Sequence, residues 1–186
     1  MYSYTYDETT GGILLNSTPL SFSKEPRPVY YMEMDVLGFD SHWQYEKNDA
    51  YPYMWAEANN YFYRGRLVAK TKGGSLYSKP EVVFLDSEAP ITTPLQFIDI
   101  PAMIGKNVEL LESLTQATIK RIYNAYTEFQ SSVDIFYVAF SGGKDSVVAF
   151  DLVQRTLPHN DFCVLFGNTR MELPDTYILT EEFKTL

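Results

Sequence analysis

The clearest pattern in the chain is an apolar run followed by a polar, glycine-rich turn and then by apolar residues at helical spacing. Residues 133–140 (VDIFYVAF) are mostly β-branched or aromatic, which predicts a buried strand. The turn covers residues 141–146 (SGGKDS), and residues 147–154 (VVAFDLVQ) repeat apolar positions with the period of a helix. A second apolar run at residues 162–166 (FCVLF) predicts another strand. Strands that alternate with helices in this order predict an α/β fold with a parallel sheet.

The hydrophobic pattern before this region predicts a long helix over residues 104–130. Apolar residues and threonines recur there at steps of three and four, which gives one face that we expect to pack on the sheet. The positions are Ile104, Val108, Leu111, Thr115, Thr118, Ile122, Ala125, Tyr126 and Phe129.

The first 104 residues show a different pattern, with short aromatic segments interrupted by prolines. Such punctuation is typical of a small β-rich module with long loops. Residues 2–15 predict a hairpin. Residues 61–71 and 76–85 predict two strands of another hairpin, joined by the turn Lys72-Gly73-Gly74-Ser75.

Composition sets limits on the chemistry. The net charge of −9 weighs against non-specific nucleic-acid binding. The single cysteine, Cys163, excludes an internal disulfide, and its apolar neighbours predict a core residue rather than a nucleophile. His42 and His159 lack ligand-like neighbours, so we predict no metal-binding residues. No apolar run is as long as a membrane span and the first residues are unlike a secretory signal, so we expect a cytoplasmic protein with no membrane partner.

The turn at residues 141–146 has the composition and the position of a phosphate-binding loop. A helix that starts just after a strand points its backbone N–H groups and the positive end of its dipole at an anion. Gly142 and Gly143 allow the backbone to turn tightly and to approach that anion closely. Ser141 and Ser146 add hydroxyl donors, and Lys144 adds a cation. The spacing fits neither the Walker A loop nor the G-x-G-x-x-G fingerprint, so the loop belongs to another class.

These six residues resemble the SGGxDS loop of the PP-loop ATP pyrophosphatases, the adenine nucleotide alpha-hydrolase-like superfamily. A second segment narrows the resemblance, because residues 172–177 (ELPDTY) are similar to the segment after the second strand in the phosphoadenosine phosphosulfate (PAPS) reductase family. Asn168 and Arg170 stand where that family usually has Asp and Gly. Loops at the carboxyl ends of neighbouring parallel strands face the same crevice, so we expect the second loop to lie beside the nucleotide.

The resemblance implies an adenine nucleotide, ATP or PAPS, as the ligand. Catalytic roles would fall to Lys144, which would offset developing charge, and to Asp145, which would help position Mg²⁺. The implied function is part of an enzyme of sulfur metabolism, either an ATP-dependent sulfurtransferase or a sulfate-reducing oxidoreductase, and the complete SGGKDS loop favours the first. The residues expected to contact the nucleotide are Ser141, Gly142, Gly143, Lys144, Asp145, Ser146, Asn168, Thr169 and Glu172.

These observations divide the chain into a β-rich accessory module, residues 1–104, and the N-terminal part of a PP-loop nucleotide-binding domain, residues 105–186. Such a domain normally has about five parallel strands, whereas the pattern predicts two here. We therefore expect an incomplete sheet that a C-terminal remainder of the same protein or a partner subunit completes. The cysteine motif of true PAPS reductases is absent from this chain, so we expect the chain alone to be inactive.

A basic and aromatic stretch supports an alternative function. No acidic residue occurs between Glu57 and Glu81. Basic residues with interleaved aromatics suit a surface for single-stranded nucleic acid, and they equally suit a hairpin with a solvated lysine face. The alternative is a non-catalytic nucleotide-binding or regulatory module that contacts nucleic acid, or a component of a DNA or tRNA thiolation sulfurtransferase. The residues are Tyr61, Phe62, Tyr63, Arg64, Arg66, Lys70, Lys72, Tyr77 and Lys79.

Overall fold

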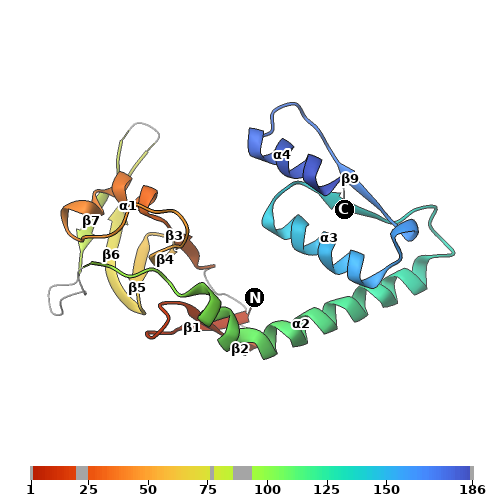
Figure 1. Cartoon of the computed structure of the whole chain (residues 1–186), viewed down its shortest axis with the longest axis horizontal. Helices are drawn as coiled ribbons and strands as arrows, with labels where there is room; N and C mark the ends of the chain where they lie inside the picture. Colours follow the sequence, from red (N-terminus) through yellow and green to blue (C-terminus); the bar gives the residue numbers. More distant parts are fainter. Residues whose placement is uncertain (1, 20–24, 76–77, 86–93, 185–186) are drawn as a thin grey trace. The chain divides into compact units, whose positions relative to one another are not determined.

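The structure is a computed structural model that describes residues 2–19, 25–75, 78–85 and 94–184, and it is a mixed α/β protein (Figure 1). The chain separates into two compact units, Met1–Leu110 and Leu111–Leu186. No helix among the described residues combines the length and the apolar character needed to cross a membrane.

The N-terminal unit is built on an antiparallel sheet in which each strand pairs with the next along the chain. A short helix, α1 (Tyr31–Leu37), follows the first of these strands and ends at Gly38, whose φ of 78° is the left-handed conformation that closes a helix. The strands are β3 (Arg27–Val29), β4 (Met54–Glu57), β5 (Asn60–Tyr63), β6 (Arg66–Lys72) and β7 (Glu81–Phe84).

The predicted hairpin after residue 61 is partly confirmed. β6 and β7 are antiparallel neighbours, with Ala69 opposite Phe84. Residues 61–71 do not form a single strand, however, because Arg64 and Gly65 have φ values of 47° and 81° and make a tight turn between β5 and β6. Arginine is rare in such a turn, so the pattern gave no signal of it. Residues 76 and 77 lie outside the described part of the chain.

Aromatic side chains fill the core of the N-terminal unit. Phe39 is fully buried. Its ring lies edge-on to the rings of Trp43, Tyr61 and Phe84, with centroids 5.2, 5.3 and 5.6 Å away. The aromatic residues of this proline-interrupted region therefore form a buried core between short strands.

The predicted N-terminal hairpin is confirmed as β1 (Tyr2–Tyr6) and β2 (Ile13–Pro19). Side chains of the larger sheet hold the backbone of its turn. Trp55 donates its indole N–H to the carbonyl of Gly11 at 3.0 Å, and the Arg64 guanidinium donates to the carbonyls of Glu8 and Thr9, both at 2.8 Å. These contacts satisfy carbonyl groups that a free hairpin turn would leave to water.

The long helix is present as α2 (Ile100–Phe129). Its only buried residue is Asn107, which donates to the carbonyl of Ile13 at 2.8 Å and accepts from the N–H of Leu15 at 2.7 Å. The side-chain amide thus pairs with β2 as a neighbouring strand would. The prediction that the apolar stripe packs on the sheet is wrong at four of its positions, which are 39–55% exposed: Ile104, Val108, Leu111 and Phe129. In its first turns the helix meets the hairpin through the Asn107 amide instead.

The C-terminal unit contains the predicted strand–helix–strand order. β8 (Tyr137–Phe140) and β9 (Cys163–Phe166) pair in parallel, with Phe140 opposite Phe166. α3 (Lys144–Thr156) lies between them in sequence, and α4 (Pro174–Phe183) follows β9, with Pro174 in its first turn as expected. Within the described residues, β8 and β9 are the whole of this parallel sheet.

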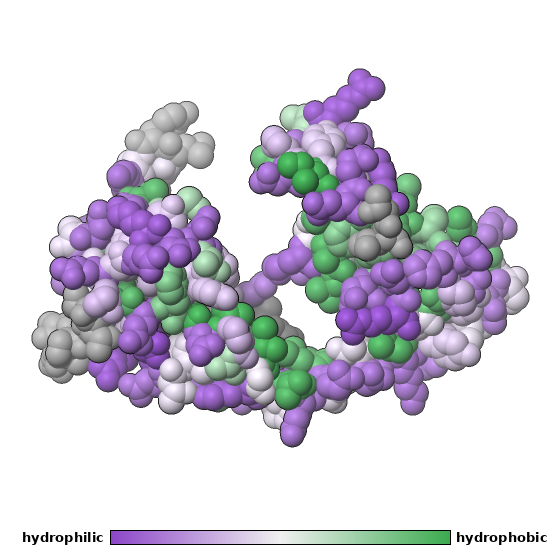
Figure 2. Space-filling view, in the orientation of Figure 1, coloured by the Kyte–Doolittle hydropathy of each residue, from purple (hydrophilic) through white to green (hydrophobic). Residues whose placement is uncertain are grey.

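One face of this sheet is covered and the other is open. Val138 and Phe140 on β8 pack with Phe150 of α3 in a small core. Cys163 and Leu165 are exposed, so the prediction that Cys163 is a core residue is wrong. An apolar strand is buried only where another layer covers it, and the described residues supply none on this face. Apolar side chains therefore reach the surface of the unit (green in Figure 2).

Candidate functional site

The predicted phosphate loop connects the carboxyl end of β8 to the first turn of α3. Gly142 has a φ of 77°, which reverses the chain after Ser141, and Gly143 is the N-cap of α3 in an extended conformation. The Ser141 hydroxyl donates to the Ser146 hydroxyl at 3.3 Å, and the Ser146 hydroxyl donates to the carbonyl of Gly143 at 2.8 Å. The two serines thus lie at the two ends of one closed turn.

No side chain caps the start of α3 through its N-cap residue, since Gly143 offers none. The amide groups of Lys144, Asp145 and Ser146 form the first turn, where backbone N–H groups lack partners within the helix. Lys144 Nζ lies 3.1 Å from a carboxylate oxygen of Asp145, and both side chains are largely exposed. An ion pair this exposed contributes little stability, so both groups are able to turn toward a ligand.

The loop contacts the element that follows the second loop. A Cβ atom added at Gly142 would lie 3.0 Å from the Thr176 methyl carbon in α4. Gly142 is therefore required both by its positive φ and by the close approach of α4. This contact joins the two segments that the sequence predicted to share one edge of the sheet.

The second loop leaves β9 at the same edge, because Phe166 pairs with Phe140 and the strands are parallel. Its shape is fixed by internal hydrogen bonds. The Thr169 hydroxyl donates to the Glu172 carboxylate at 2.5 Å. The Asn168 side-chain oxygen accepts from the Arg170 N–H at 2.8 Å and from the Tyr177 hydroxyl at 3.1 Å. These oxygen atoms of Asn168 and Glu172 hold the loop together, and their contact with a nucleotide stays a prediction.

Arg170 has an unusual backbone conformation in this loop. Its φ is 64°, in the left-handed region. That region costs a residue other than glycine about 1 kcal/mol. The Asn168 contact to the Arg170 N–H holds the backbone there.

The basic and aromatic stretch does not form a base-stacking surface. Tyr61 and Tyr63 are buried in the core of the N-terminal unit, and Phe62 stacks against Tyr6 with centroids 4.9 Å apart. The Arg64 guanidinium is occupied by the carbonyls of the hairpin turn. The rings of Tyr61 and Tyr63 are therefore not exposed for stacking on bases, and contact of this stretch with nucleic acid stays a prediction. Tyr77 lies outside the described residues.

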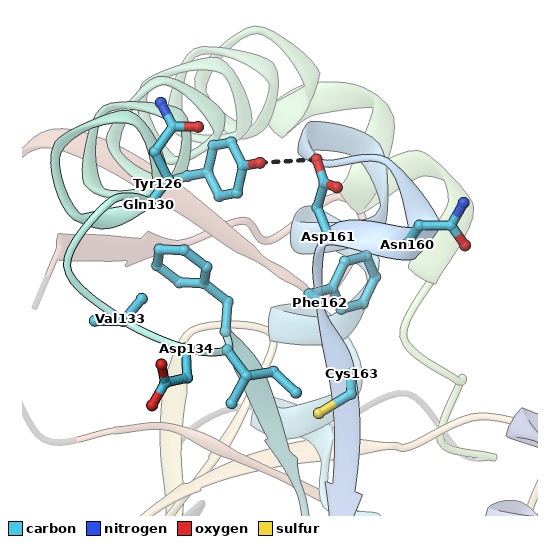
Figure 3. Close-up of a pocket in the computed structure, with 10 residues that line it drawn as sticks. Tyr126, Gln130, Val133, Asp134, Asn160, Asp161, Phe162 and Cys163 are labelled. Atoms are coloured by element: carbon cyan, nitrogen blue, oxygen red, sulfur yellow. Dashed lines mark hydrogen bonds between the residues drawn. The ribbon is translucent and has the colours of Figure 1, made fainter.

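A pocket that the sequence did not indicate lies at the amino ends of β8 and β9 (Figure 3). There the Tyr126 hydroxyl donates to the Asp161 carboxylate at 2.8 Å, and this hydrogen bond raises the pKa of Tyr126. The pocket is also lined by Asp134 and Cys163. In open parallel sheets, ligands bind at the carboxyl ends of the strands. This pocket lies at the opposite ends, so we interpret it as part of the packing between α2 and the sheet. No sequence motif marked Tyr126 or Asp161 as partners.

Within the described ranges, no three His, Cys, Asp or Glu side chains gather in a group that could hold a metal ion. Comparison with protein-family models, with curated proteins and with solved structures gave no match.

Proposed function

We propose that the C-terminal unit binds the phosphates of an adenine nucleotide, ATP or PAPS, at the loop Ser141–Ser146, as part of an ATP-dependent sulfurtransferase or a related PAPS reductase-family enzyme. The observation that carries the proposal is the uncapped start of α3 directly after β8, with Gly142 and Gly143 in the turn. Backbone N–H groups and the helix dipole favour an anion at such a position. This function requires that β8 and β9 belong to a PP-loop parallel sheet, which is a more specific fold than the mixed α/β class.

In the ATP-dependent reaction, an oxygen of the acceptor attacks the α-phosphorus, the bond to the bridging oxygen breaks, and pyrophosphate leaves. The first-turn N–H groups and the Ser141 and Ser146 hydroxyls would hold the pyrophosphate. Lys144 would offset the charge that develops on the leaving group. The serine hydroxyls and the Lys144 ammonium group lie in the same turn, so one loop would bind the nucleotide and stabilise the pyrophosphate as it leaves.

Mg²⁺ usually accompanies nucleotides of this kind. It is commonly held by one or two carboxylates together with phosphate oxygens and water. Asp145 offers one largely exposed carboxylate in the loop, which fits that requirement. When bound, the ion would neutralise phosphate charge, and the remaining oxygen ligands would come from the nucleotide and from water.

Gly143 offers a sharper test than Gly142. A Cβ at Gly143 would meet only the Ser141 hydroxyl at 3.5 Å, an ordinary contact, and its φ is −80°. Asp is a good N-cap residue, so Gly143→Asp should fold at least as well as the wild type. Its carboxylate should repel phosphate and weaken ATP binding at least tenfold, as measured by titration calorimetry.

Gly143→Asn is the matched control, because it has the same size without the charge, and we expect it to bind ATP with intermediate affinity. The proposal fails if the wild type binds neither ATP nor PAPS, or if Gly143→Asp binds as tightly as the wild type. Tighter binding of ATP than of PAPS by the wild type would favour the sulfurtransferase class, and tighter binding of PAPS would favour the reductase class.

A further inference from the structure

Two arginines of this protein occupy the left-handed region, and they differ in what their side chains do. Arg64 has a φ of 47° and Arg170 a φ of 64°. The Arg64 guanidinium donates to two backbone carbonyls of the hairpin turn and to the side-chain oxygen of Gln96 at 3.1 Å. The structure therefore explains why an arginine stands at position 64.

Arg170 has no such explanation within the folded unit. Its backbone N–H is held by Asn168, but its exposed guanidinium makes no hydrogen bond or ion pair with any residue that the structure describes. Glycine would adopt the same backbone conformation without strain. Unfavourable backbone conformations that packing does not require are concentrated at functional sites.

The position of Arg170 relates it to the phosphate loop. Phe140 and Phe166 are paired, so Ser141 and Gly167 leave the sheet side by side. Arg170 is three residues beyond Gly167, which places its Cα within about 11 Å of that of Gly167. Gly142 lies close to Thr176 in the first turn of α4, the helix into which the second loop leads. A long, flexible side chain at position 170 can therefore reach a ligand seated at the start of α3.

The charges at this edge leave Arg170 available for an anion. The Glu172 carboxylate in the same loop accepts from the Thr169 hydroxyl, and the Asp145 carboxylate faces Lys144. Asp175 lies in the first turn of α4, where the helix dipole favours it. A guanidinium suits phosphate because it donates two parallel hydrogen bonds.

We infer that Arg170 is a phosphate-binding residue, which contacts from the second loop the phosphates of the nucleotide held by Ser141–Ser146. The inference rests on the proposed function of that loop. In this inference, the positively charged guanidinium of Arg170 binds the phosphates of the nucleotide and makes no contact with its base.

The test compares Arg170→Gly, Arg170→Lys and Arg64→Gly in the full chain, with ATP and adenosine as the ligands in titration calorimetry. Arg170→Gly should be at least as resistant to thermal unfolding as the wild type, because glycine removes the strain. It should bind ATP at least tenfold more weakly and adenosine unchanged. Arg170→Lys should recover part of the ATP affinity. Arg64→Gly should lower the thermal midpoint of the N-terminal unit and leave ATP affinity unchanged.

The outcomes separate this inference from the proposed function. If the wild type binds no ATP, the proposed function fails, and this inference fails with it. If the wild type binds ATP and Gly143→Asp does not, while Arg170→Gly binds ATP as the wild type does, the loop is a nucleotide site and only the role of Arg170 is overturned. Equal losses of ATP and adenosine affinity in Arg170→Gly would also overturn it, because a phosphate contact cannot affect adenosine.

Discussion

The two units of the protein bury their side chains to very different extents. The largest fully buried side chains, among them Tyr53, Phe39 and Met34, all belong to the N-terminal unit. Among the described residues of the C-terminal unit, even the best-buried large residue, Phe140, keeps 4% of its surface exposed, and Leu165 keeps 56%. Stability is therefore concentrated in the unit without the phosphate loop, and the loop belongs to the less covered unit. Regions with fewer buried contacts open more readily, and ligand-binding elements are often drawn from them.

The largest effect should come from opening the aromatic core. Phe39→Ala removes a fully buried ring that contacts three others, and we expect it to lower the free energy of unfolding by about 3–5 kcal/mol. Urea unfolding followed by tryptophan fluorescence would measure it. The two tryptophans, Trp43 and Trp55, both lie in the N-terminal unit, so the signal reports on that unit. A loss below about 1 kcal/mol would contradict the concentration of stability there.

The next effect depends on pH. The Asp7 carboxylate accepts from Lys106 Nζ at 2.6 Å and from the Thr10 hydroxyl at 2.7 Å, and these contacts hold the pKa of Asp7 well below its usual range. A lowered folded pKa stabilises the protein above the unfolded pKa, near 4, and this contribution is lost as the pH falls through the folded value. Asp7→Asn should cost about 1.5–3 kcal/mol at pH 7.

The same urea experiment at pH 7 and pH 2 measures this prediction. The difference between Asp7→Asn and the wild type should shrink between pH 7 and pH 2, because the Asp7 carboxylate of the unfolded chain binds a proton over this range while the folded protein holds it ionised. Lys106→Met removes the main cause of the low pKa and should shift the loss of stability to higher pH. A difference that stays constant with pH would show that the ionisation of Asp7 is not what stabilises the hairpin.

Asn107→Ala should have a comparable or smaller effect. It leaves the carbonyl of Ile13 and the N–H of Leu15 without their partner in a partly buried place, which costs about 1–3 kcal/mol. Asn124→Ala, at an exposed position of the same helix, is the matched control and should change stability by less than about 0.5 kcal/mol. Equal effects of the two variants would mean that helix propensity matters here and the link to β2 does not.

The smallest effect should come from the open face of the β8–β9 sheet. Leu165→Ser changes a side chain that is 56% exposed, and we expect a change below about 0.5 kcal/mol in thermal unfolding followed by far-ultraviolet circular dichroism. Its solubility should rise, because the apolar surface becomes smaller. A large loss of stability would show that another layer covers this face in solution, which would remove the contrast between the two units.

The sequence predicted best where pattern and local chemistry agree. The strand, turn and helix around Ser141, the helix that begins at Pro174, and the hairpin around residues 7–12 follow from spacing, glycine and proline. The sequence did not predict the Arg64–Gly65 turn, because this turn depends on side-chain contacts to a hairpin that is distant in the sequence. It also did not predict the exposure of Cys163, because a local pattern cannot report whether another layer covers the sheet. The internal bonding of Asn168 and Glu172 was also beyond the sequence, since motif residues do not reveal whether they face a ligand or each other.

The boundary between the units falls inside α2, and this has a consequence for how the chain folds. Starting a helix is unfavourable, whereas extending one is easy. Lys106 and Asn107 fasten the first turns of α2 to the β1–β2 hairpin, so the folded N-terminal unit supplies a helix nucleus. That unit leaves the ribosome first. Residues 111–129 can then add to the nucleus one hydrogen bond at a time and lead the chain toward β8 before the slower pairing of the parallel strands begins.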